Sequence, residues 1–176
     1  YYPEWGAHNR SMLRILALTL AIEAIGESED TAEWNQMRHL LAEESIGHWS
    51  IEDAEMYMSL WLLATLEHAR YTGKEREYFA MPQTRYYFDF ISHLITPTGQ
   101  IPDYGDSHFM ACWDLWVGCL EKGAAMYQDG RMKYLADRVR EFGLVTEGEN
   151  INVSVGQYLV HAYLFADESL EPVKPD

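Results

Sequence analysis

Apolar residues recur along the chain at the three- and four-residue spacing of amphipathic α-helices. In the second of these runs the pattern predicts that Trp34, Met37, Leu40 and Leu41 face inward. No stretch alternates strictly between apolar and polar positions, so no strand is predicted. The pattern predicts seven helices, over residues 11–25, 31–43, 50–71, 84–95, 107–127, 132–142 and 154–165. Helical hairpins joined in series give a bundle, a solenoid or an α/α toroid, and periodicity alone does not choose among them.

Breaker and capping residues set the expected ends of these helices. Asn9 and Asp30 precede the first two helices as candidate N-caps, and Gly26 closes the first. Residues 98–106, Thr-Gly-Gln-Ile-Pro-Asp-Tyr-Gly-Asp, contain enough turn-forming residues to predict a loop. Ser107 is expected to cap the long helix that follows this loop.

The composition describes a globular chain with an acidic surface. Its 176 residues fit one domain, 48% are hydrophobic, and aromatic residues reach 14%. That aromatic excess suits a thick helical core or a surface that stacks on sugar rings. The net charge of −15 disfavours nucleic acid and anionic membranes as partners, and also a polyanion unless basic groups gather locally. No apolar run is long enough to cross a bilayer.

The two cysteines are predicted to be unpaired. Cys112 and Cys119 lie seven positions apart on one predicted helix, a separation of about 10 Å at the helical rise, which is too long for a disulfide. We expect both thiols to be mostly buried. The chain opens on Tyr1-Tyr2-Pro3 without an initiator Met or a targeting segment, so we expect it to belong to a longer polypeptide.

Three segments, in this order and spacing, resemble the heparinase II/III-like polysaccharide lyase superfamily. They are residues 49–73 (beginning Trp-Ser-Ile-Glu-Asp-Ala-Glu-Met-Tyr), 99–107 (Gly-Gln-Ile-Pro-Asp-Tyr-Gly-Asp-Ser) and 158–172 (beginning Tyr-Leu-Val-His-Ala-Tyr). The resemblance implies that residues 1–166 are later helices of an incomplete α/α toroid. Residues 167–176 would then connect to a β-sandwich, and the missing helices and sandwich would be partners within the same polypeptide. It also implies a bacterial periplasmic or extracellular location.

The same resemblance implies a reaction and its residues. Such lyases cleave uronic-acid-containing glycans by β-elimination, which needs neutralisation of the uronate carboxylate and a proton-transfer group. Family members use an Asn, often followed by a His, as neutraliser and a Tyr as acid or base. Here His8 and Asn9 stand in the reverse order, and Tyr57 follows on a later helix. The alternative roles are an N-cap for Asn9 and a core position for Tyr57.

Further side chains are candidates for binding an acidic polysaccharide or oligosaccharide. Arg10 and Arg14 lie four apart, so they can either bind a substrate carboxylate or pair with acidic neighbours. The other predicted substrate-binding residues are Trp61, Tyr104, Asp106 and His108. The remaining histidines show no metal-ligand spacing, and no phosphate-binding loop is present, so no metal or cofactor is predicted.

Two other functions stay open at this point. A glycoside hydrolase on the same architecture needs two carboxylates across one cleft, with Glu52, Asp53, Asp103 and Asp106 as candidates. A non-catalytic, glycan-binding helical domain is the third possibility, and the net charge of −15 suits it better than a lyase of polyanions.

Overall fold

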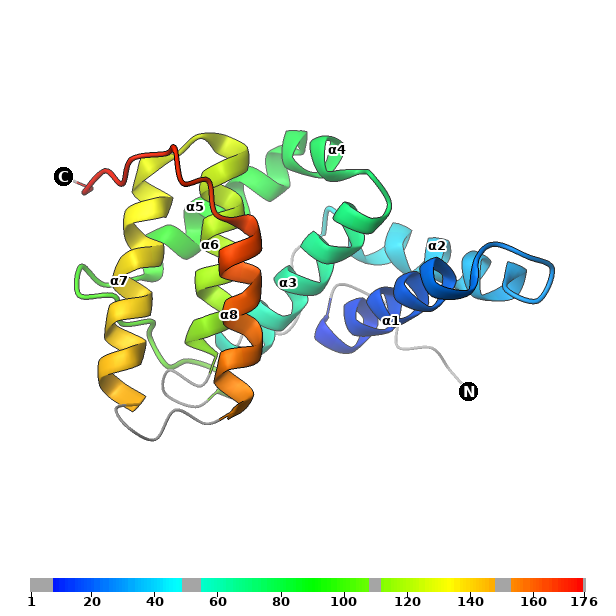
Figure 1. Cartoon of the computed structure of the whole chain (residues 1–176), viewed down its shortest axis with the longest axis horizontal. Coiled ribbons are helices and arrows are strands. Elements are labelled where there is room, and N and C mark those ends of the chain that lie inside the picture. The colour runs from blue at the N-terminus through cyan, green and yellow to red at the C-terminus, as the bar shows by residue number, and fades with distance from the viewer. Residues whose placement is uncertain (1–7, 49–54, 108–111, 148–152, 176) are drawn as a thin grey trace.

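The protein is all-helical in the computed structural model, which describes residues 8–48, 55–107, 112–147 and 153–175. No strand occurs in those ranges, so the prediction of an all-α fold is confirmed. The helices are α1 (Asn9–Ile25), α2 (Ala32–Ser45), α3 (Glu55–Tyr71), α4 (Glu75–Ala80), α5 (Pro82–Leu94), α6 (Trp113–Tyr127), α7 (Gly130–Glu147) and α8 (Val153–Phe165) (Figure 1). Seven match predicted segments, and the short α4 was not predicted. The closure of such hairpins into a toroid stays a prediction.

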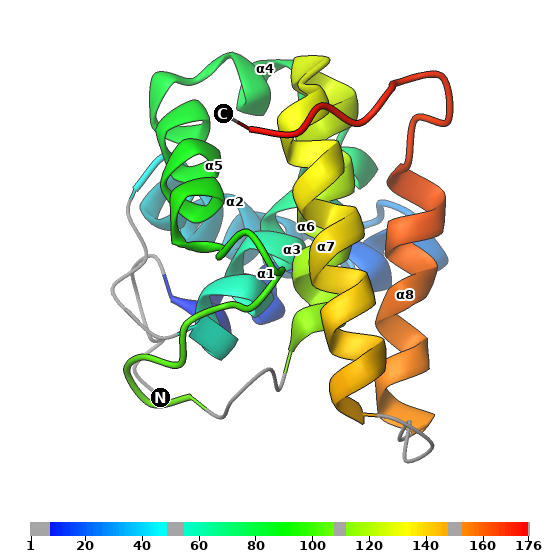
Figure 2. The same cartoon turned by 90° about the vertical axis from the view of Figure 1, so that its left-hand side faces the viewer.

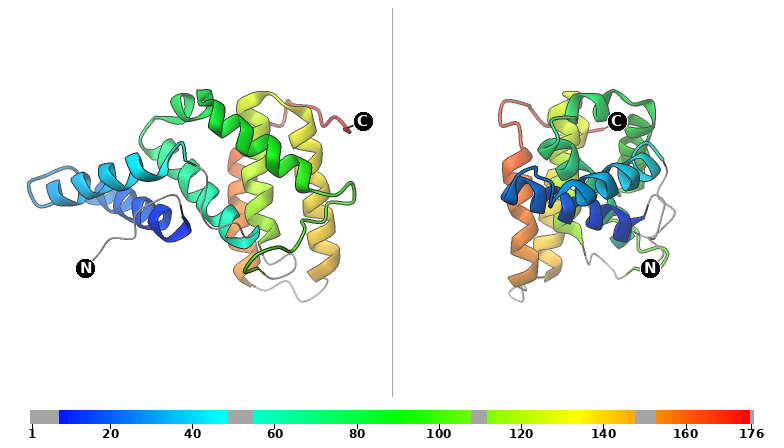
Figure 3. Two further views of the ribbon diagram at one scale, coloured as in Figure 1. Left: turned by 180° about the vertical axis from the view of Figure 1, so that it is seen from behind. Right: turned by 90° about the vertical axis from the view of Figure 1, so that its right-hand side faces the viewer.

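Two groups of helices make up the structure, and α3 joins them. The α1–α2 hairpin projects to one side, and α1 packs along α3 (Figures 1 and 3). At the other side α6 packs between α7 and α8, while α3 also contacts α6. Figure 2 shows α5 across from α7 and α8, with α4 leading into it. Because α3 borders both groups, nearly all of its residues from Met58 to Ala69 are buried.

The aromatic excess is largely explained by the core. Trp61, Trp113 and Trp116 are among the largest fully buried side chains. Phe79, Phe88 and Tyr127 form a further cluster with ring centroids 5.2–5.7 Å apart. Aromatic pairs at these separations stabilise a core beyond the burial of their area alone. The aromatic excess left open whether the rings stack on sugars or fill the core. Most of the rings pack against other helices.

The starts of α1 and α2 differ from the predicted capping. His8 takes the N-cap position of α1, where its Nδ1 accepts a hydrogen bond from the Ser11 amide at 3.4 Å, so Asn9 is the first helical residue and not the cap. At α2, Thr31 precedes the helix in place of Asp30. The Thr31 hydroxyl accepts from the Ser28 amide and donates to the Gly26 carbonyl, which ties the turn between the helices.

The buried face of α2 was predicted only in part. Leu41 is fully buried, but Trp34 and Leu40 are about 40% exposed. The buried residues of α2 are Arg38, Leu41 and Ser45, so the inward face is rotated from the predicted one and includes two polar side chains. The three-to-four-residue spacing of these positions is as regular as that of the predicted face. On this face Ser45 Oγ of α2 forms a hydrogen bond with Ser11 Oγ of α1 at 3.3 Å.

The long helix after the loop begins later than expected, at Trp113, and Ser107 does not cap it. Residues 108–111 lie outside the described residues. Both cysteines are free, as predicted, with Cys119 buried and Cys112 half-buried.

Candidate functional site

The first turns of α1 and α3 lie at the same end of these two packed helices. Both helices run in the same general direction (Figures 1 and 3), and the Thr19 hydroxyl of α1 hydrogen-bonds His68 Nδ1 of α3 at 2.8 Å. With an equal rise per residue, ten positions back from this contact reach Asn9 on α1 and Met58 on α3. The segments that the sequence analysis connected, around Asn9 and around Tyr57, are therefore neighbouring helix starts.

The loop before α6 packs on the same first turn of α3. The Glu55 amide donates to the Tyr104 carbonyl at 3.4 Å, and the Met56 amide donates to Ser107 Oγ at 3.2 Å. These bonds satisfy two of the amides that a helix start leaves without an intrahelical acceptor. Gly99 holds the other end of the loop, because its φ of +91° and its close approach to the Arg138 carbonyl of α7 leave no room for a side chain.

Glu55 joins this loop to the core and was not identified from the sequence. Its carboxylate is buried and accepts from the Ser107 hydroxyl at 2.8 Å and from Trp116 Nε1 at 2.7 Å. Burial raises the pKa of Glu55, and the two hydrogen bonds oppose that change without cancelling it. Glu55 thus holds α3, α6 and the loop together. Its sequence signal, an acidic residue in a first helical turn, is common to many surface helices.

The proposed catalytic residues occupy different environments. His8 and Asn9 are buried at the start of α1, and Tyr57 is half-buried at the start of α3. Tyr57 is therefore in neither the fully packed core nor open solvent. Tyr104 is also half-buried, and its hydroxyl donates to the Met58 sulfur at 3.4 Å. These segments lie at the same end of the α1–α3 pair, and their catalytic roles stay predictions.

The predicted substrate-binding residues are more scattered. Arg10 and Asp106 are exposed, and Arg14 is half-buried. His108 lies outside the described residues. Trp61 is only 2% exposed, and its ring lies 4.9 Å from that of Tyr87. Trp61 follows Tyr57 by one helical turn on the same side of α3, as the spacing of four predicts.

Trp61 lines a cavity of about 580 Å³ between α3 and the start of α5. Its walls are mainly aromatic, and none of them is a carboxylate; they comprise Gly47, His48, Trp61, Tyr78, Pro82, Gln83, Thr84, Tyr86 and Tyr87. We call this space the aromatic pocket. The indole Nε1–H of Trp61 is buried and has no acceptor among the described residues. A buried donor of this kind is costly unless an acceptor reaches it, so it suits a ligand oxygen.

Of the carboxylates considered for a hydrolase, the two that the structure describes do not line this pocket. Asp103 and Asp106 are exposed on the loop, while Glu52 and Asp53 lie outside the described residues. Within the described ranges no group of three or more His, Cys, Asp or Glu side chains could hold a metal ion. No helix of the described part is long and apolar enough to span a membrane.

Comparisons with protein-family models, with curated proteins and with solved structures give no match to this chain. The resemblance to heparinase II/III-like lyases therefore stays a prediction from sequence, and the functional argument depends on the site itself.

Proposed function

We propose that this chain forms part of a polysaccharide lyase that cleaves a uronic-acid-containing glycan by β-elimination. The observation that carries the proposal is the aromatic pocket, which is lined by Trp61 one helical turn from Tyr57; the buried Nε1–H of this indole has no acceptor among the described residues. Flat rings stack on the faces of sugars, and a buried indole N–H can donate to a hydroxyl or ring oxygen. A glycan held there extends toward the starts of α1 and α3.

The chemistry assigned to those helix starts is elimination across C4 and C5 of the uronate. The Asn9 amide donates hydrogen bonds to the uronate carboxylate, which makes the C5 proton more acidic. Tyr57 takes part in proton transfer: the C5–H bond breaks, the C4–C5 double bond forms, and the C4–O bond cleaves. The departing oxygen gains a proton, so no water is consumed. His8, whose Nδ1 caps α1, fixes the position of Asn9.

A non-catalytic glycan-binding domain is the second candidate, and the same pocket favours it. Stacking and hydrogen bonding to Trp61 require no reacting group, and none of the described carboxylates lines the aromatic pocket. A hydrolase finds less support because Asp103 and Asp106 are exposed on the loop.

The decisive experiment incubates the full-length protein with polyuronates such as polygalacturonate, alginate and glucuronate-containing glycans. A lyase releases unsaturated uronates that absorb in the ultraviolet, whereas a binding domain retains the glycan and yields no product. In the Tyr57→Phe variant, elimination should fall by about a hundredfold or more. Tyr163→Phe, which removes a hydroxyl from an exposed ring on α8, is the matched control. Wild-type elimination by Tyr57→Phe would refute the role of Tyr57.

A further inference from the structure

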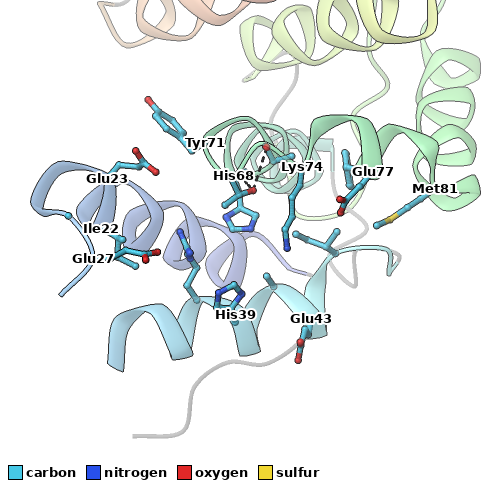
Figure 4. Close-up of a pocket in the computed structure, with 17 residues that line it drawn as sticks. Ile22, Glu23, Glu27, His39, Glu43, His68, Tyr71, Lys74, Glu77 and Met81 are labelled. Carbon is cyan, nitrogen blue, oxygen red and sulfur yellow. Dashed lines mark hydrogen bonds between the residues drawn. The ribbon is translucent and has the colours of Figure 1, made fainter. Parts of the chain in front are cut away.

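A second, larger cavity lies at the other end of α1 and α3, where both helices meet α2 and α4 (Figure 4). Its volume is about 800 Å³, and Tyr78 separates it from the aromatic pocket, since this residue lines both. We call it the α1–α2–α3 pocket. Its charged and histidine side chains are Glu23, Glu27, Arg38, His39, Glu43, His68, Lys74 and Glu77.

Arg38 in this pocket is a buried cation with no anionic partner in the part of the chain that the structure describes. It is 7% exposed, and its one hydrogen bond runs from Nη2 to Asn35 Oδ1 at 2.7 Å. The Nε–H is buried and has no acceptor, and Arg38 forms no ion pair with any carboxylate of the described residues. Burial of a charge is unfavourable unless it is paired, so this guanidinium is arranged for an anion from outside the described structure.

His68 adds a hydrogen-bond acceptor to the same pocket. The single hydroxyl hydrogen of Thr19 is donated to the Ile15 carbonyl at 2.7 Å, so the Thr19 oxygen must accept from His68 Nδ1–H at 2.8 Å. The other ring nitrogen, Nε2, then carries a lone pair. Burial first, and the charge of Arg38 second, lower the pKa of His68 to about 4, which keeps the ring neutral at physiological pH.

The remaining charges narrow the choice of anion. Figure 4 shows His39, His68 and Lys74 directed into one space, while Glu43 points away from it. The four carboxylates of the pocket are all exposed, so solvent screens them more than it screens Arg38. Their presence nevertheless disfavours a dianion such as phosphate relative to a singly charged carboxylate.

We propose that the α1–α2–α3 pocket binds a small hydroxycarboxylate. Its carboxylate accepts hydrogen bonds from the Arg38 guanidinium, and one of its hydroxyls donates to His68 Nε2. The planar guanidinium fork matches a carboxylate, and charge-assisted bonds of this kind are strong when buried. The site does not depend on the proposed lyase activity, because none of its ligand contacts involves Asn9, Tyr57 or Trp61.

Calorimetric titration near neutral pH tests the proposal with matched probes. D-gluconate carries a carboxylate and hydroxyls, sorbitol replaces the carboxylate with a hydroxymethyl group, and acetate lacks the hydroxyls. We expect gluconate to bind more tightly than acetate, and sorbitol not to bind. Arg38→Met should weaken gluconate binding by about tenfold or more, because the variant loses a charged hydrogen bond to the carboxylate. Arg76→Met, which removes an exposed arginine from α4 next to the pocket, should leave binding unchanged.

Three results would overturn the proposal: equal affinity for gluconate and sorbitol, tighter binding of inorganic phosphate, or unchanged binding in Arg38→Met. If Arg38→Met does not fold, side-chain NMR of the wild type still decides, because gluconate must shift the Arg38 Nε–H and His68 ring signals and sorbitol must not. Binding lost in Trp61→Phe but kept in Arg38→Met would place gluconate in the aromatic pocket and refute the present site. That outcome would leave the proposed glycan function standing.

Discussion

Acidification should destabilise the folded protein through His68 before carboxylates with ordinary pKa values become protonated. The folded state keeps this ring neutral, with a pKa of about 4, whereas the unfolded chain protonates it near 6.5. Below pH 6.5 the unfolded state therefore binds more protons than the folded state. By linkage, the free energy of unfolding falls as the pH drops from about 6.5 toward about 4.

The size of this effect follows from the two pKa values. A difference of about 2.5 in pKa corresponds to about 3 kcal/mol once the whole interval has been crossed. At about pH 5 the unfolded ring is almost fully protonated and the folded ring is still mostly neutral, so about 2 kcal/mol is lost. For a domain with about 5–15 kcal/mol of total stability, that loss is large enough to measure.

The assay is urea unfolding of the wild type and of His68→Asn at about pH 7 and about pH 5. The Asn amide can still donate to Thr19 Oγ1 but cannot be protonated, so every other titrating group cancels in the difference. We expect the wild-type advantage over His68→Asn to shrink by about 2 kcal/mol between the two pH values. An advantage that stays constant with pH would show that the folded ring binds protons as readily as the unfolded one, and would refute the buried, neutral His68.

Three further outcomes test the packing. Gly143→Ala should destabilise the protein by about 2 kcal/mol despite better helix propensity, because the new Cβ would clash with the buried Trp113 ring. Thermal unfolding measures the loss, and Leu144→Ala, at an exposed neighbour, is the control. Glu55→Ala should cost more than Glu55→Gln, which keeps one acceptor oxygen. Glu55→Gln should gain stability relative to wild type as the pH rises above the ordinary Glu range, since burial raises the Glu55 pKa. Burial also raises the pKa of both thiols, that of Cys112 to about 12. Iodoacetamide should therefore modify Cys112 and Cys119 quickly only in the unfolded protein, as mass spectrometry would show. Rapid labelling of the native protein would contradict this.

Much of the fold could be predicted because helix formation leaves a periodic trace in the sequence. Gly26 marks the end of α1 as expected, with φ of +92°. The inward face of α2 was harder to predict, because its apolar side chains are spread around the helix. Leu40 lies about 120° around from Trp34, and Trp34 shares a face with the buried Leu41 but is itself 39% exposed. Which side of α2 is buried depends on how α1 and α2 approach each other. That approach is set by tertiary packing and cannot be predicted from the sequence of α2 alone. The short α4 was missed because six residues carry too little periodicity to recognise.

Some residues of the candidate sites could be predicted from the sequence, and others could not. The side chains at the starts of α1 and α3 could be proposed because a family resemblance connected distant segments. Glu55 and Arg38 could not, because their importance lies in burial, and charged residues at helical positions are usually solvated. For Arg38 a local signal did exist, since it shares the three-to-four spacing of Leu41 and Ser45. A cation on that stripe predicts a buried charge only once the stripe itself is known to face inward.

The pairing of other buried charges shows why Arg38 is unusual in this protein. Glu121 on α6 is buried, and Lys133 and Arg140 of α7 reach it at 2.8 and 3.6 Å. Glu67 on α3 is buried and pairs with Arg70 at 2.7 Å. The chain has 28 acidic and 13 basic residues, so an arginine is far more easily paired here than a carboxylate. Arg38 is nevertheless buried with no carboxylate of the described residues beside it, next to a histidine whose Nε2 is an acceptor. This is the arrangement expected when the counter-ion is a ligand.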